Sequence, residues 1–244
     1  MSTTSTVFPV SPAAPEPGTS THFLQFFMSP GEYCANLKRQ PKWLAAFVVS
    51  SIIMLVTNIA MLPFSRAALF ASLPQGVSAE QIEAMEKQVE STKYIGLAFS
   101  PIGVLLSAVL MAMLVVMLMQ SISGKGEYKT ILALTVHIGM ISALGAALRL
   151  GTLYTMGGPE SIRNAKDLKV AMGLNVLFSG LPPALDSILN SINVMEIWSL
   201  CLIVVGLRGM YRISRSIAVA VAGGYWFVTT GFSAGIALIL NSSK

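Results

Sequence analysis

The feature that most constrains this sequence is the apolar stretch that follows Val194 near its C-terminal end. It continues for about 20 mostly apolar residues, enough for a helix to cross a bilayer core of roughly 30 Å. Glu196 and Trp198 mark one end, and Arg208 and Arg212 mark the other. Aromatic rings and snorkelling arginines are favoured at the depth of the lipid headgroups. The stretch therefore predicts a spanning helix with an anchor at each end.

Four further apolar segments share this character. The chain is 54% apolar and 11% charged, with a mean hydropathy of +0.69, whereas soluble proteins are about 25% charged. We expect an all-α integral membrane protein with five transmembrane helices and additional short interfacial or re-entrant helices. The expected spans are residues 43–64, 95–119, 131–148, 194–213 and 217–240, which form a membrane domain of residues 43–240 followed by a tail of residues 241–244.

Charge and residue spacing argue against several kinds of site. The net charge of +5 is scattered, without a basic cluster that would bind nucleic acid. Cys34 and Cys201 are interpreted as two unrelated reduced thiols, and His22 and His137 lie too far apart to suggest a zinc site. The sequence contains no nucleophile elbow, zinc-protease motif or dinucleotide-binding glycines. We expect a protein that is not an enzyme, with no catalytic residue, metal or cofactor.

The N-terminal region divides into two parts. Residues 1–21 are rich in Ser, Thr and Pro and lack Lys and Arg, which favours a disordered tail over a signal peptide. Residues 22–42 predict an amphipathic helix in the membrane interface, with Ser29 as N-cap, Glu32 closing a capping box and Pro41 stopping the helix. A simple lead-in to the first span is the alternative. Trp43 is the expected interfacial anchor of that span.

The loop after the first span contains a second predicted helix start. Ser78 and Gln81 have the spacing of a capping box, and four glutamates follow along one face. This pattern predicts a short amphipathic acidic helix outside the hydrocarbon, with the glutamates solvated.

Small residues recur at helical spacing in three of the expected spans, where they allow helices to approach closely in lipid. We expect them to pack within the bundle, and a contact between two copies is the alternative for the pair in the last span. The candidate packing residues are Gly96, Ser100, Gly103, Ser107, Gly139, Gly231 and Gly235.

Polar residues inside the apolar segments are costly and call for an explanation. His137 lies about 12 Å into its span at 1.5 Å per residue. We interpret it as structural, a neutral imidazole bonded to a neighbouring Ser or Thr. Asn58 is the strongly polar residue of the first span. Arg149 and Glu196 are expected at the same membrane surface, where we predict an ion pair, with independent solvation as the alternative.

Residues 170–192 allow two interpretations, short interfacial or re-entrant helices or a sixth span. With five spans, the short loops richest in Lys and Arg fall on one side of the membrane. The positive-inside rule therefore favours five spans, with the N-terminus in the cytoplasm and the C-terminus outside.

Several motifs occur in an order that resembles the Ypt-interacting-protein (Yip) domain family, over about residues 23–240. They are Ser29-Pro30 before Trp43, the turn Gly126-Glu127-Tyr128-Lys129, the run Ile197-Trp198-Ser199-Leu200, Gly206-Leu207 and Ile213-Ser214. The resemblance implies a five-span membrane protein with a cytoplasmic N-terminus. Eukaryotic relatives act in vesicle traffic with Rab-type GTPases and carry a Tyr-Gly-Pro signature that is missing here. The chain is more similar to the bacterial branch, some of whose members occur beside ABC-type exporters as accessory membrane subunits.

The expected function is that of a non-enzymatic adaptor in the bacterial cytoplasmic (inner) membrane. Its expected partners are membrane lipid and other membrane proteins such as ABC exporter components, together with a homo-oligomer as a further contact. The alternative is a small transporter or channel subunit with a polar path near His137 and residues 170–192.

Overall fold

The computed structural model describes residues 25–71, 73, 77–168, 170, 172–178 and 180–242. The predicted disordered tail of residues 1–21 lies outside the described residues, as do residues 243–244 of the expected C-terminal tail. Within the described ranges the chain is helical, and its only β-pairing there is an isolated bridge between Gly173 and Asn193. The expected all-α class is confirmed.

Five helices in the described part of the chain are long and apolar enough to cross a membrane, as the apolar runs predict. They are α3 (Leu44–Ala71), α4 (Ala79–Ser123), α5 (Tyr128–Thr155), α7 (Val194–Tyr211) and α8 (Arg215–Ser242). Several extend beyond the expected spans, and α3 continues past Pro63, near which its span was expected to end.

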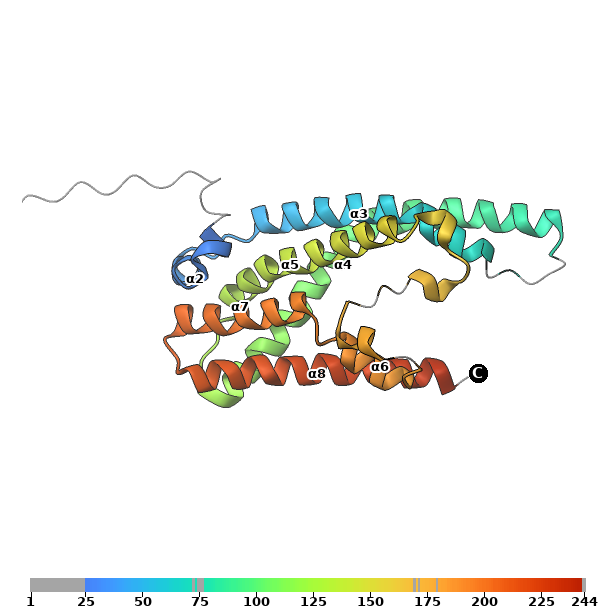
Figure 1. The fold of residues 1–244 in the computed structure, drawn as a ribbon. Helices are drawn as coiled ribbons and strands as arrows, with labels where there is room; N and C mark the ends of the chain where they lie inside the picture. Colours follow the sequence, from blue (N-terminus) through green and yellow to red (C-terminus); the bar gives the residue numbers. More distant parts are fainter. Residues whose placement is uncertain are drawn as a thin grey trace, which may run out of the picture.

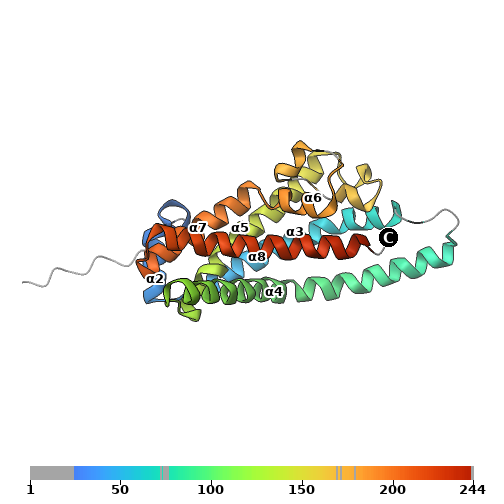
Figure 2. The same ribbon diagram turned by 90° about the horizontal axis from the view of Figure 1, so that it is seen from below.

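The five long helices form an elongated bundle with α5 at its centre (Figure 1). Of the 18-residue apolar stretch of α5, 56% is buried, because α3, α4 and α7 all pack around this helix. The corresponding share in α3 is 17%. α8 covers α7 and touches α4 (Figure 2). Large side chains such as Leu134, Ile141 and Ile203 are fully buried where these helices meet.

The acidic stretch after Ser78 is not a separate short helix, so that prediction is wrong. It begins with the predicted capping box, in which the Ser78 Oγ accepts from the Gln81 N–H and the Gln81 side chain accepts from the Ser78 N–H. The helix then continues without a break into the second span, because residues 91–95 contain neither Gly nor Pro. The N-terminal part of α4 reaches beyond the other helices (Figure 2).

The predicted N-terminal helix is α2 (Pro30–Arg39), with Ser29 as N-cap. Its predicted capping box does not form, because residues 25–28 already make a helical turn and the Ser29 N–H donates to the Gln25 carbonyl at 2.8 Å. That donor is therefore unavailable to Glu32, which is exposed.

Residues 170–192 do not form a sixth span. They contain a 3-10 turn, η3 (Leu174–Leu177), and a short helix, α6 (Pro183–Asn190). Two further 3-10 turns, η1 (Pro159–Ser161) and η2 (Ala165–Leu168), precede them. The region folds back on itself and α6 packs on α8. A Cβ at Gly173 would lie 2.6 Å from the carbonyl oxygens of Leu189 and Asn190, so the fold-back requires glycine there.

The two ends of the bundle carry different sets of charged residues, and the elements that form each end can be followed in Figure 1. One end, which we call the basic end, holds α2, the start of α3, the α4–α5 turn and the α7–α8 turn. Its basic residues are Lys38, Arg39, Lys42, Lys125, Lys129, Arg208, Arg212 and Arg215. The opposite end, which we call the acidic end, holds the start of α4 with Glu80, Glu83, Glu86 and Glu90.

Candidate functional site

The candidate site is the basic end, where α2 is built into the bundle. Gly31, Cys34 and Leu37 recur every three residues and so share one face of α2. Cys34 and Leu37 are buried against α7 and α5, and Phe26 in the preceding turn is fully buried. The apolar face of α2 thus packs on protein, where the sequence predicts a helix lying on lipid.

Two glycines of α7 allow α2 and α5 to approach closely. A Cβ at Gly209 would lie 2.6 Å from the Gly31 carbonyl oxygen, and real Cβ atoms essentially never come this close to another heavy atom. A Cβ at Gly206 would lie 2.7 Å from Leu134 of α5 and 3.4 Å from the Cys34 sulfur. The close approach at the basic end therefore depends on hydrogen as the side chain at both positions.

A buried aromatic cluster joins α2 to α5. The rings of Phe26 and Tyr33 lie 5.4 and 5.2 Å, centroid to centroid, from that of His137, which is 2% exposed. Phe27 contacts Trp198 of α7 at 5.7 Å. Trp198, predicted as an interfacial anchor, is therefore part of the protein packing around α2.

The hydrogen bonds of His137 determine its tautomer. Nδ1 lies 2.7 Å from the Ala133 carbonyl oxygen, which can only accept, so Nδ1 carries a proton. In the neutral ring Nε2 is then an acceptor, and the Tyr33 hydroxyl donates to it at 2.7 Å. The predicted Ser or Thr partner is wrong, because α2 supplies the donor. That His137 has a structural role stays a prediction.

Both ionisable side chains on the buried side of α2 are kept protonated. Burial raises the pKa of the Tyr33 hydroxyl to about 12, with a smaller contribution from the nearby Cys34. Burial likewise raises the pKa of the Cys34 thiol to about 12. At neutral pH Tyr33 is therefore a hydrogen-bond donor and Cys34 an unreactive thiol.

Polar contacts link the docked helix α2 to its neighbours. The Glu127 N–H donates to the Tyr211 hydroxyl at 2.9 Å, and the Lys38 ammonium lies 4.9 Å from the centre of the Tyr211 ring. These contacts tie the α4–α5 turn, the end of α7 and α2 together. Arg208 and Arg212 are exposed at this end, and their role as interfacial anchors stays a prediction.

Other predicted residues lie elsewhere in the bundle. Trp43 is partly buried and contacts Phe47 at 6.0 Å. Asn58 donates to the Ser100 hydroxyl at 3.0 Å and so links α3 to α4. Ser100 therefore contacts another helix through a hydrogen bond, whereas the sequence predicts only that its small side chain allows close approach.

The predicted ion pair between Arg149 and Glu196 does not form. Met195, which precedes Glu196 in α7, meets α5 at Gly145. Glu196 is partly buried, whereas Arg149 is exposed.

Most of the predicted small-residue stripes do not pack within the chain. Gly96, Gly103 and Ser107 are exposed, and no described atom of another helix lies within 4 Å of a Cβ added at either of these two glycines. The same is true of Cβ atoms added at Gly139, Gly231 and Gly235, although Gly139 and Gly235 are partly buried. The prediction of intramolecular packing is wrong at the exposed glycines Gly96, Gly103 and Gly231, because α4 and α8 turn other faces inward, through residues such as Ala112 and Ala218.

The residues missed by sequence reasoning are Phe26, Tyr33, Gly31 and Gly209. One signal was available, since Gly206 and Gly209 lie one helical turn apart in a span that already has charged ends. A polar path joining His137 to residues 170–192 is not formed: His137 is enclosed by α2, whereas α6 packs on η3 and α8.

These features define an all-α integral membrane protein whose N-terminal helix is an integral part of the bundle. A family model, the Yip1 domain, matches residues 24–237, and the chain belongs to that family, as its motifs predict. It is similar to "Membrane protein YknW" of Bacillus subtilis (strain 168), with 28% identity over 206 residues that cover 81% of this chain and 83% of that protein. No solved structure matches the chain.

Proposed function

We propose that this protein is a non-enzymatic membrane adaptor that binds another membrane protein through its basic end. The observation that carries the proposal is the locked position of α2. Its inner face is fixed by the hydrogen bond between Tyr33 and His137, so its outer face is a rigid platform. The exposed residues of that platform are Glu32, Ala35, Asn36, Lys38 and Arg39.

A rigid platform suits recognition because little conformational entropy is lost when a partner binds it. The platform carries Lys38 and Arg39 and lies beside Arg208 and Arg212, so a partner with acidic residues is complementary to it. An ABC-type exporter component is our first candidate, since the bacterial branch that the sequence resembles includes members found beside such exporters.

We assign the protein to the bacterial cytoplasmic membrane, with its N-terminus in the cytoplasm and its C-terminus outside. Support comes from the basic residues in the short α4–α5 and α7–α8 turns, which lie at the same end of the bundle, and from the relative's description as a membrane protein. The outward-facing glycines of α4 and α8, including Gly103 and Gly231, are the proposed lateral contacts with partner helices or a second copy.

The test is partner capture with two matched charge reversals. Tagged wild-type protein, Arg39→Glu and Arg163→Glu are purified in a gentle detergent and the retained proteins are identified by mass spectrometry. Arg39 lies on the platform, whereas Arg163 is exposed in the loop between α5 and α6. We expect a specific membrane partner with wild type and with Arg163→Glu, and its loss with Arg39→Glu.

Two results would contradict the proposal. One is equal retention of the partner by all three proteins, which would move the contact away from α2. The other is solute flux through liposomes that contain only this protein, which would make it a transporter.

A further inference from the structure

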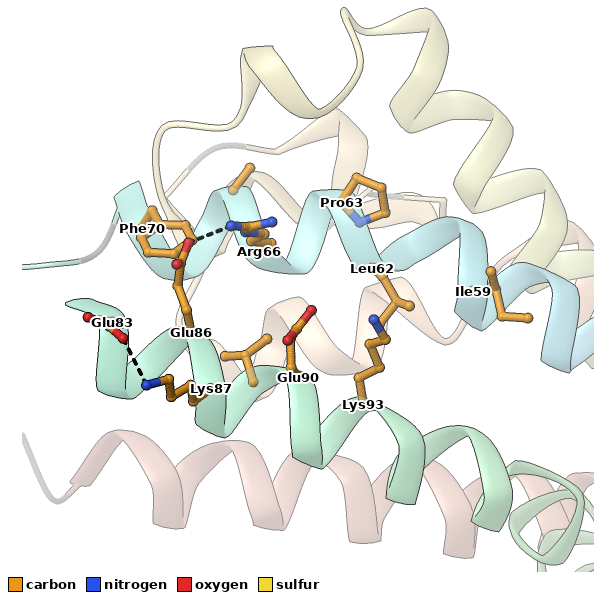
Figure 3. A pocket seen from close by; sticks show the side chains of 12 residues that line it. Ile59, Leu62, Pro63, Arg66, Phe70, Glu83, Glu86, Lys87, Glu90 and Lys93 are labelled. Atoms are coloured by element: carbon orange, nitrogen blue, oxygen red, sulfur yellow. Dashed lines mark hydrogen bonds and ion pairs between the residues drawn. The ribbon is translucent and has the colours of Figure 1, made fainter. Parts of the chain in front are cut away.

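A pocket of about 830 Å³ lies between the end of α3 and the start of α4, at the acidic end (Figure 3). A second hollow of about 460 Å³ shares Leu62, Val89 and Lys93 with it. The two helices touch where Asn58 bonds to Ser100 and separate beyond that point. The first pocket is lined by charged side chains as well as apolar ones. Its charged residues are Arg66, Glu83, Glu86, Lys87, Glu90 and Lys93.

Four of these six charges are paired within the protein. Arg66 forms an ion pair with Glu86, and Lys87 pairs with Glu83 at 2.8 Å. Glu90 and Lys93 make no ion pair with any described residue, and both extend from α4 toward α3 (Figure 3). The Lys93 ammonium lies 4.8 Å from the centre of the Tyr94 ring. The pocket thus offers one carboxylate and one ammonium, one helical turn apart on the same face.

The pocket lies at the level where α4 changes from charged to apolar. Residues up to Lys93 are rich in charge, and the apolar surface begins with Tyr94 and Ile95, which are 65% and 60% exposed. An aromatic ring and a lysine at this change of character are typical of headgroup depth. The occupant therefore comes from the bilayer and has a polar head and apolar tails.

We propose that this pocket binds a phospholipid whose headgroup carries a phosphate and a primary ammonium, that is, phosphatidylethanolamine. Its ammonium donates to Glu90, and its phosphate accepts from Lys93. Its acyl chains extend from Lys93 along the exposed apolar side chains of α4 that begin with Tyr94 and Ile95. Phosphatidylcholine has no N–H to donate, and phosphatidylglycerol has no cation for Glu90.

The test is lipid retention measured by native mass spectrometry. Purified full-length protein is incubated with equal amounts of phosphatidylethanolamine, phosphatidylcholine and phosphatidylglycerol that have identical acyl chains. We expect wild type to retain phosphatidylethanolamine about threefold to fivefold more than either competitor, the range given by partly solvated charge pairs. The double variant Glu90→Gln with Lys93→Gln should lose this preference.

The matched control is Glu80→Gln with Lys129→Gln, which removes the same two charges from exposed positions that do not line the pocket. It should retain the wild-type preference, and the unfolding temperatures of both double variants should agree. Equal retention of the three lipids by wild type would overturn the proposal. A preference that survives in the Glu90 and Lys93 variant would also overturn it, as would a preference for phosphatidylglycerol.

Discussion

The Tyr33 hydroxyl lies 2.7 Å from Nε2 of His137, a residue 104 positions further along the chain. This hydrogen bond joins a helix outside the spans to the most buried helix of the bundle. It fixes both α2 and the tautomer of the histidine, because Nδ1 is already bonded to the Ala133 carbonyl. The first prediction concerns this contact.

Tyr33→Phe should lower the free energy of unfolding by about 1–3 kcal/mol, because it leaves the buried Nε2 of His137 without a donor. Thermal unfolding in detergent checks this. Tyr94→Phe removes a hydroxyl from a side chain that is 65% exposed and should leave stability unchanged. The double variant Tyr33→Phe with His137→Phe should cost less than the sum of its single changes, and strict additivity would argue against the bond.

Gly209→Ala should weaken the docking of α2. The added Cβ would lie 2.6 Å from the Gly31 carbonyl oxygen, so one of the two helices must shift. The readout is alkylation of Cys34, which is fully buried in the wild-type protein and should react faster in the variant. Gly231→Ala meets no described neighbour within 4 Å and is the control, and equal rates in both variants would contradict the close contact.

Stability should be nearly constant from pH 6 to about pH 9 and should fall at higher pH. Folding raises the pKa of Cys34 from its ordinary value of 9.0, and that of Tyr33 from 10.0, to about 12 in each case. The unfolded chain therefore loses these protons first, and the stabilisation disappears as pH rises from about 9 toward 12. Unfolding temperatures measured across this range should fall less steeply in Cys34→Ala. An identical slope in that variant would show that Cys34 does not contribute.

Asn58→Ala and Ser100→Ala should each weaken the packing of α3 on α4 by about 0.6 kcal/mol, the average for hydrogen bonds between membrane helices. Because both changes remove the same 3.0 Å bond, the double variant should cost little more than either single one. A steric-trapping or denaturant titration provides the four stabilities. Full additivity would mean that the two side chains do not interact.

The five spans could be predicted because apolar runs of sufficient length have few other uses. The continuity of α4 was mispredicted although residues 91–95 visibly contain neither Gly nor Pro, because a change from charged to apolar residues does not by itself end a helix. The apolar face of α2 was visible in the sequence, but periodicity does not tell whether that face meets lipid or protein. Phe26 suits the membrane interface as well as it suits a protein core.

The small-residue stripes show the same limit. A row of small side chains marks a surface that another helix can approach, but it does not say which helix occupies it. Gly96 and Gly103 face outward, whereas Gly206, noted only as part of a family motif, and Gly209, which was missed, make close contacts between helices. His137 was recognised as unusual for its depth, yet its partner Tyr33 lies in another helix and no spacing rule connects the two.

The central claim is that α2 is part of the bundle, and oxidative cross-linking of paired cysteines tests it most directly. A Cβ at Gly31 would lie 3.6 Å from Val205 of α7. In a background with Cys34→Ala and Cys201→Ala, the pair Gly31→Cys and Val205→Cys should cross-link rapidly in lipid nanodiscs. The pair Gly31→Cys and Val219→Cys, which uses an exposed position on α8, should not. Similar slow cross-linking in both pairs would show that α2 lies free on the membrane surface and would contradict the account.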